Sequence, residues 1–100
     1  MLLLRRVQGV SMQPLLRDGQ LVLLWGHAVP RIGKVFLIND DGEQKIKIIT
    51  RVDGQRVWYS GANQQSTDSR DKGWVVRSSI RATLLWPRIS DQSTIHSTLI

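Results

Sequence analysis

The sequence predicts a mainly β protein, built from a coiled, barrel-like sheet with at most one short helical turn. Its apolar runs are short, and turn signals such as the Asp-Gly pair at 53–54 separate them. No stretch shows a long helical period. The chain has 100 residues, of which 41% are hydrophobic and 22% charged, so it fits one domain with a modest core.

The expected strands follow the apolar runs along the chain. The best helical candidate is a single turn around residues 14–17, and Pro87 ends the final strand because it cannot donate to a sheet ladder. The strands are expected at residues 20–25, 34–39, 44–52, 55–59, 74–76 and 80–86. In the longest, one face is expected to carry Ile46, Ile48, Thr50 and Val52, and the other Lys45, Lys47, Ile49 and Arg51.

The chain divides into a domain over residues 1–88 and a polar tail over residues 89–100. At the N-terminus, three leucines at 2–4 precede Arg5 and Arg6. This apolar run is far shorter than the ~20 residues that span a bilayer, so no transmembrane segment is expected. The run is expected either to touch a membrane surface or to form the edge strand of a cleft.

Composition excludes several kinds of site. The chain has no cysteine, which excludes disulfides and thiolate chemistry and makes the cytoplasm the default location. His27 and His96 do not have metal-ligand spacing, so no metal or other cofactor is expected. The net charge of +6 would suit nucleic acid, but the bases are spread along the chain, which favours an ordinary solvated surface.

Ser11 lies in a segment that favours a bend. Gly9 permits close backbone approach, and Pro14 stiffens the turn that follows. Such a bend exposes a hydroxyl and directs backbone N–H groups toward one point, which is how an oxyanion hole is formed. Taken alone, the segment is more typical of a plain turn.

A serine nucleophile needs a base, and neither histidine lies in a context that suggests one. A lysine can act as a base only when it is neutral, and burial in apolar surroundings favours the neutral amine. Lys47 suits this role because isoleucines surround it at 46, 48 and 49. The alternative is that Lys45 and Lys47 simply face water on the polar side of a strand.

Three motifs follow one another between residues 7 and 87. The first has Gly9, Ser11, Met12, Pro14, Leu16 and Gly19; the second has Lys47, Gly54 and Val57; the third has Gly61, Asn63, Ser66, Thr67, Asp68, Ser69, Arg70 and Gly73. In this order they resemble the signal peptidase I family of Ser/Lys peptidases. The sequence departs from the family pattern at Gln20, Ile48 and Ala62, each of which replaces a charged residue.

The resemblance implies the family's coiled β-sheet core and a serine peptidase. Ser11 would attack the scissile carbonyl, and Lys47 would take its proton. Gly9 lacks the hydroxyl that some members use in the oxyanion hole, so the backbone N–H of Ser11 is expected to supply more of that stabilisation. The remaining implied roles are orientation of the lysine by Ser66, a structural ion pair between Asp68 and Arg70, and lining of the substrate cleft by Met12.

Within the family, the chain resembles the short branch of nickel-type superoxide dismutase maturation proteases, which share the Ser-Thr-Asp-Ser-Arg run at 66–70 and the Trp-Pro pair at 86–87. This implies an endopeptidase that removes a short N-terminal propeptide from a protein substrate.

Three alternatives stay open. A signal-peptidase-like enzyme would use the same Ser/Lys pair on another substrate. A self-cleaving repressor would also use it, but that type cuts upstream of its serine, and only ten residues precede Ser11 here. A non-catalytic basic β-barrel that binds nucleic acid would suit the net charge and the four tryptophans. We expect the tryptophans to pack at the core or its rim instead, and we expect no nucleic-acid partner.

Overall fold

The computed structural model describes residues 1–63 and 73–92, and it confirms the mainly β prediction. The helical content of these residues is one short 3-10 turn, η1 (Arg77–Ser79). The expected strands form within one residue of their predicted bounds, and the N-terminal apolar run adds a further strand. The strands are β1 (Leu2–Arg6), β2 (Leu21–Trp25), β3 (Val35–Asp40), β4 (Glu43–Asp53), β5 (Arg56–Ser60), β6 (Trp74–Val76) and β7 (Ile80–Trp86).

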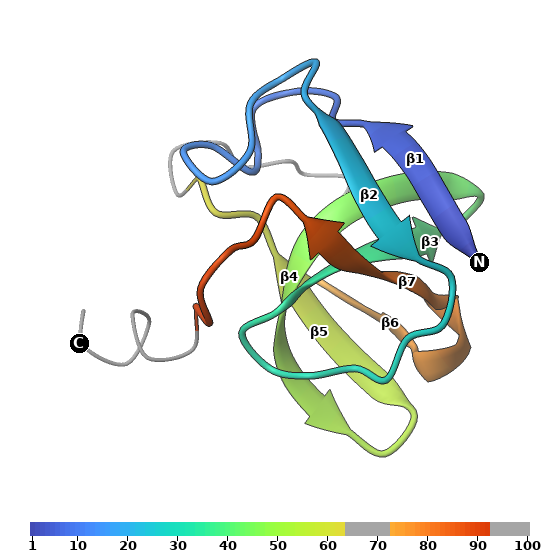
Figure 1. Cartoon of the computed structure of the whole chain (residues 1–100). Coiled ribbons are helices and arrows are strands. Elements are labelled where there is room, and N and C mark those ends of the chain that lie inside the picture. The colour runs from blue at the N-terminus through green and yellow to red at the C-terminus, as the bar shows by residue number, and fades with distance from the viewer. Residues whose placement is uncertain (64–72, 93–100) are drawn as a thin grey trace.

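The seven strands form one antiparallel sheet that curls into a half-barrel (Figure 1). Their order is β1-β2-β7-β3-β4-β5-β6, so β7 returns to lie between β2 and β3. β5 pairs with β4 only from Ile48 onward, so residues 43–47 of β4 pair with β3 alone. β1 lies at one end of the sheet. Both β1 and the first half of β4 therefore keep a strand edge that no other described strand covers.

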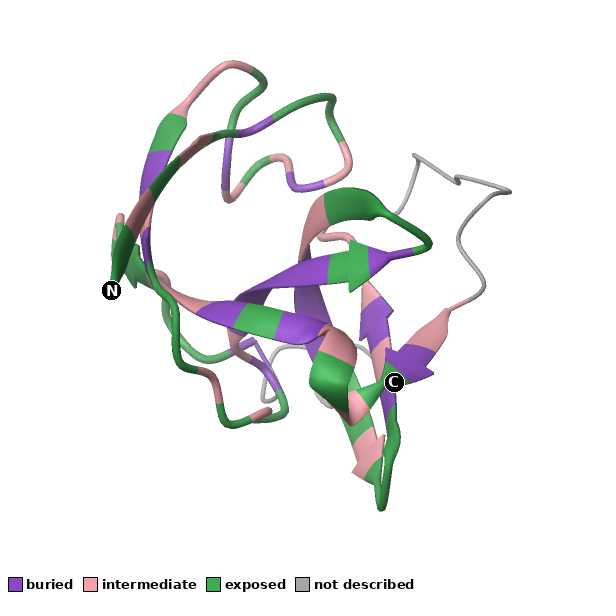
Figure 2. Cartoon of the chain, turned by 90° about the vertical axis from the view of Figure 1, so that its right-hand side faces the viewer, coloured by how far each residue is buried: buried purple, intermediate pink, exposed green. Residues whose placement is uncertain are grey.

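Two apolar clusters lie on opposite faces of the sheet, and buried residues alternate with more exposed ones along several strands (Figure 2). On β4, Ile48 belongs to the first cluster and Ile49 to the second, and Lys47 faces the same way as Ile49. The first cluster contains Val7, Met12, Leu16, Val22, Leu24, Val35, Leu37, Ile48 and Ala82. The second contains Phe36, Ile38, Ile49, Val57, Tyr59, Val75 and Ile80.

The alternation predicted for the second half of β4 is wrong. The pairing of β4 with β5 shifts between Ile49 and Arg51, where Thr50 is the extra residue. An extra residue in one strand reverses the face to which the following residues point. Val52 therefore packs against the second cluster together with Ile49, whereas the sequence pattern placed it on the face of Ile48.

The N-terminal run forms the edge strand that was one of its two expected states. The predicted turn near residues 14–17 is a single bonded turn in which the Leu16 N–H donates to the Met12 carbonyl over 2.9 Å. Beyond the last strand, the Gln92 N–H donates to the Gly33 carbonyl over 2.9 Å, and residues 93–100 lie outside the described residues. Within 1–63 and 73–92, no helix has the length and apolarity needed to cross a bilayer.

A buried carboxylate ties β3, β4 and β5 together. Asp40 is buried, and its Oδ2 accepts a hydrogen bond from the Tyr59 hydroxyl over 2.7 Å. The Lys45 amine lies 3.5 Å from the same oxygen. Burying a carboxylate is unfavourable unless hydrogen bonds and opposite charge replace its water, so these contacts hold the ends of the three strands in register.

We expect Tyr59→Phe to lower the free energy of unfolding by about 1–3 kcal/mol, because the buried carboxylate loses a hydrogen-bond donor. Urea denaturation followed by tryptophan fluorescence measures this loss. Thr50→Val, which removes an exposed hydroxyl from β4, is the control and should change stability much less. Equal stability of the two variants would contradict the role given to Asp40.

Candidate active site

Ser11 stands on a closed loop that leaves the sheet after β1 and returns at β2. The loop is closed at its base, where the Val7 N–H donates to the Gln20 carbonyl (2.8 Å) and the Gly19 N–H donates to the Val7 carbonyl (2.7 Å). Gly9 has a φ of 84°, which a glycine adopts without the strain that other residues have. Its N–H donates to Asp18 Oδ1 over 2.8 Å. The loop is therefore held by its own backbone and by the Asp18 side chain.

Two apolar side chains anchor the same loop to the sheet. Met12 and Leu16 are both buried in the first cluster, so the residue after the serine is fixed in the core. Ser11 itself is intermediate in exposure, with Met12 on one side in the chain and the exposed Val10 on the other. This arrangement places a serine hydroxyl at the surface of a rigid turn.

The segment after β5 clamps the serine backbone from the other side. The Asn63 N–H donates to the Ser11 carbonyl over 2.8 Å, and the Asn63 side-chain amide donates to the Val10 carbonyl over 3.1 Å. Gly61 packs so closely that a Cβ at this position would overlap the Ser11 carbonyl oxygen. The sequence motif contained Gly61 and Asn63 but gave neither a role. Their contacts show that they support the backbone of the serine.

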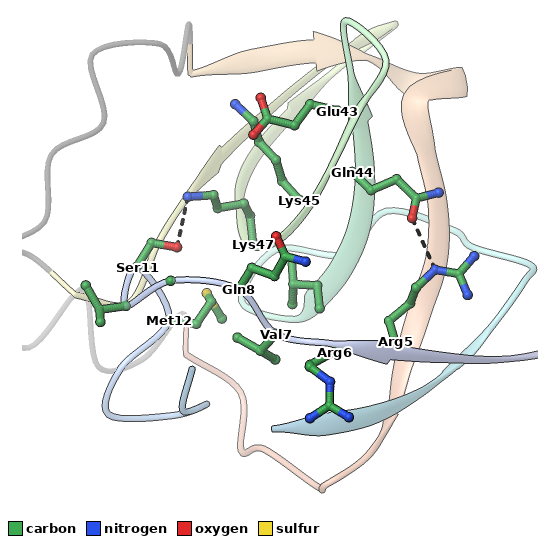
Figure 3. A pocket seen from close by; sticks show the side chains of 13 residues that line it. Arg5, Arg6, Val7, Gln8, Ser11, Met12, Glu43, Gln44, Lys45 and Lys47 are labelled. Atoms are coloured by element: carbon green, nitrogen blue, oxygen red, sulfur yellow. Dashed lines mark hydrogen bonds between the residues drawn. The ribbon is translucent and has the colours of Figure 1, made fainter. Parts of the chain in front are cut away.

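Lys47 reaches the serine from the middle of β4, where it pairs with Phe36 of β3. Only 6% of its surface is exposed, so the alternative that it faces water is wrong. Its Nζ donates a hydrogen bond to Ser11 Oγ over 3.2 Å (Figure 3). Two residues that are 36 positions apart in the sequence thus meet as a nucleophile and base would, within the distance that proton transfer requires.

A groove of about 650 Å³ begins at this pair and runs between the open edges of β1 and β4. In Figure 3 the Ser11–Lys47 pair lies at one end of the groove, and a second hydrogen bond, between Arg5 and Gln44, lies at the other. The groove is lined by residues 5–12 on one side and 43–47 on the other.

The other predicted site residues fall into two groups. Gly9 and Met12 line the groove, and their roles toward a substrate stay predictions. Ser66, Asp68 and Arg70 lie outside the described residues, so their implied roles stay predictions.

The three departures from the family pattern each have a structural setting. The Gln20 side chain accepts a hydrogen bond from the Arg17 N–H over 3.0 Å and so closes the serine loop without a charge. Ile48 is buried in the first cluster, and Ala62 packs against that cluster. At these three positions, neutral or apolar contacts therefore stand where the family pattern has a charged residue.

The described residues contain no group of three or more His, Asp or Glu side chains that could hold a metal ion. The arrangement that the structure does contain is a serine hydroxyl and a buried amine at the end of a groove. The chain was compared with models of protein families and with curated proteins, and neither comparison found a match.

We expect Gly61→Ala to destabilise the fold by about 1–3 kcal/mol, because the added methyl group must displace the Ser11 carbonyl or the segment after β5. Thermal denaturation measures the change. Gly26→Ala is the matched control, since the nearest atom to a Cβ there would be the carbonyl oxygen of the terminal residue Met1 at 3.2 Å, which overlaps less than the contact at Gly61. A Gly61→Ala protein as stable as the control would count against the close packing at Ser11.

Proposed function

We propose that the protein is a serine endopeptidase that works through a Ser/Lys pair. The observation that carries the proposal is the 3.2 Å contact between Ser11 Oγ and the amine of Lys47, a residue that is only 6% exposed. Burial disfavours the charged form of an amine. A neutral amine beside a hydroxyl is the base that a serine nucleophile requires.

In the first half of the reaction, Ser11 Oγ forms a bond to the scissile carbonyl carbon while its proton moves to Lys47 Nζ. The carbonyl oxygen becomes an oxyanion, for which the backbone N–H of Ser11 is the proposed donor. The C–N bond then breaks, and the leaving amine takes the proton from Lys47 Nζ. The products are an acyl ester on Ser11 and the free C-terminal fragment of the substrate.

In the second half, a water molecule attacks the ester carbonyl. Lys47 Nζ takes one proton from this water and returns it to Ser11 Oγ as the ester bond breaks. The N-terminal fragment leaves as a carboxylic acid, and the Ser11–Lys47 pair is restored. The anchored serine loop supports both steps, because it holds the Ser11 backbone in place while the bonds to Oγ form and break.

The groove supports a peptide as the substrate. It lies between two strand edges, on β1 and on residues 43–47 of β4, whose outward N–H and C=O groups no other described strand pairs. An extended peptide can add to such edges through main-chain hydrogen bonds. Recognition of backbone, with side chains selected by the groove lining, is the mode that suits an endopeptidase.

The resemblance of the three motifs to the signal peptidase I family supports the same chemistry. The likeness to the short maturation-protease branch points to the propeptide of a nickel-type superoxide dismutase as the substrate. The proposed substrate, a nickel-type superoxide dismutase precursor, rests on the sequence motifs alone.

We expect Ser11→Ala and Lys47→Ala each to lower kcat/KM by about 10⁴-fold or more, because each removes one member of a pair that acts as a unit. Release of the propeptide from a nickel-type superoxide dismutase precursor, and cleavage within a mixture of peptides, measure the activity. Ser78→Ala and Lys34→Ala are matched controls, since both residues lie outside the groove. Cleavage that persists in both active-site variants would rule out this mechanism. Salt-sensitive nucleic-acid binding without cleavage would support the binding module instead.

We expect kcat/KM to rise with pH from acid toward alkaline conditions. A general base must be unprotonated to accept the serine proton, so a rate that depends on such a base falls as acid is added. Initial rates between pH 5 and 9 test this, with circular dichroism at each pH as the control for folding. A flat profile over this range would be inconsistent with lysine as the base.

A further inference from the structure

The end of the groove away from Ser11 carries a positive charge. Arg5 comes from β1 and crosses toward β4, where its Nε–H donates to Gln44 Oε1 over 3.1 Å (Figure 3). Its Nη1–H donates to the Leu4 carbonyl over 2.9 Å. Both acceptors are neutral, and these two bonds use two of the five N–H groups of the guanidinium. Arg5 therefore retains its charge and further donors at the groove.

The neighbouring charged groups do not cancel this charge. Glu43 is the nearest carboxylate along β4, but strand alternation places it on the opposite face from Gln44. Lys45 lies on that opposite face too, where it contacts the buried Asp40. Arg6 points away from the groove in Figure 3 and donates to the Gly19 carbonyl over 2.8 Å. None of the carboxylates in residues 1–63 and 73–92 forms an ion pair with Arg5.

The position of Arg5 along the groove follows from the strand repeat. Gln44 precedes Lys47 by three residues, which is about 10 Å of extended strand. Nearer the serine, Val7 and Ile46 both line the groove, where Val7 belongs to the first cluster and Ile46 packs against it. Arg5 stands two residues before Val7, and Gln44 two before Ile46, so both lie on this same face. The side chains of a bound extended peptide alternate with the same two-residue repeat. If one peptide side chain lies over Val7 and Ile46, the side chain two residues further along therefore lies at Arg5 and Gln44.

We infer that Arg5 makes this end of the groove a subsite for an acidic side chain. The inference rests on the proposed peptidase function and names a substrate class for it: peptides with Asp or Glu two residues from the side chain that lies over Val7 and Ile46. The guanidinium of Arg5 receives the carboxylate with a charge-assisted hydrogen bond, and Gln44 holds the guanidinium in place. A lysine or arginine side chain at the same position is repelled.

The test uses the full chain and a peptide mixture made by digesting a proteome with chymotrypsin, which leaves Asp, Glu, Lys and Arg inside the peptides, with cleavage sites located by mass spectrometry. We expect the wild-type protein to favour Asp and Glu at one position of the cleaved peptides. For a pair of synthetic peptides that differ only by Glu or Gln there, kcat/KM should differ about tenfold. Arg5→Gln should remove this preference, whereas Arg81→Gln, the same charge change at an exposed site outside the groove, should keep it.

Arg5→Glu separates a change of specificity from a loss of folding. The inference expects this variant to favour Lys or Arg at the position where the wild type favours Asp or Glu, and a misfolded protein would not gain a new preference. Wild-type cleavage without an acidic preference, or a preference that persists in both Arg5 variants, overturns the inference and leaves the peptidase function standing. If the wild type cleaves no peptide at all, both proposals fall.

Discussion

A lysine amine kept away from water beside a serine hydroxyl is the constraint on which the remaining architecture depends. Lys47 is 6% exposed, and its Nζ lies 3.2 Å from Ser11 Oγ. An isolated buried ammonium is costly, and a short contact between two side chains on separate segments needs both backbones to be fixed. The structure fixes both backbones, because Lys47 lies on a strand and Ser11 lies on an anchored loop.

The curl of the sheet supplies both of these supports. β4 carries the lysine through the middle of the half-barrel, and β1 leads into the serine loop from the edge. Because β5 joins β4 only at Ile48, the residues that lead up to the lysine keep an open edge along the groove. The segment that follows β5 then returns to the serine through Gly61 and Asn63. β4 therefore contributes both the lysine and one wall of the groove. Its neighbour β5 leads into the segment that supports the serine.

The positions of most strands could be predicted from the sequence, because short apolar runs mark the strands and turn residues mark their ends. The meeting of Ser11 with Lys47 was expected from the motifs that resemble the peptidase family, because the bend alone is more typical of a plain turn and a strand lysine is more often exposed. The bulge at Thr50 was missed, since threonine is an ordinary strand residue and nothing nearby interrupts the pattern. The contact of Arg5 with Gln44 joins residues 39 positions apart, and no local pattern predicts it. The close packing of Gly61 on Ser11 likewise depends on how the sheet closes.

The bulge at Thr50 also decides which sequence changes this strand tolerates. Ordinary alternation sends Ile48 and Ile49 into opposite apolar clusters. The bulge that follows brings Val52 inward beside Ile49 and Arg51 outward, where its guanidinium lies 4.6 Å from the centre of the Trp58 ring. The strand thus contains a phase shift of one residue. Deleting Thr50 would leave Ile49, Arg51 and Val52 in regular alternation opposite Tyr59, Trp58 and Val57, so Val52 would still point inward and Arg51 outward. The strand can therefore lose its bulge residue, whereas a deletion in its regular part would turn the residues beyond it to the other face.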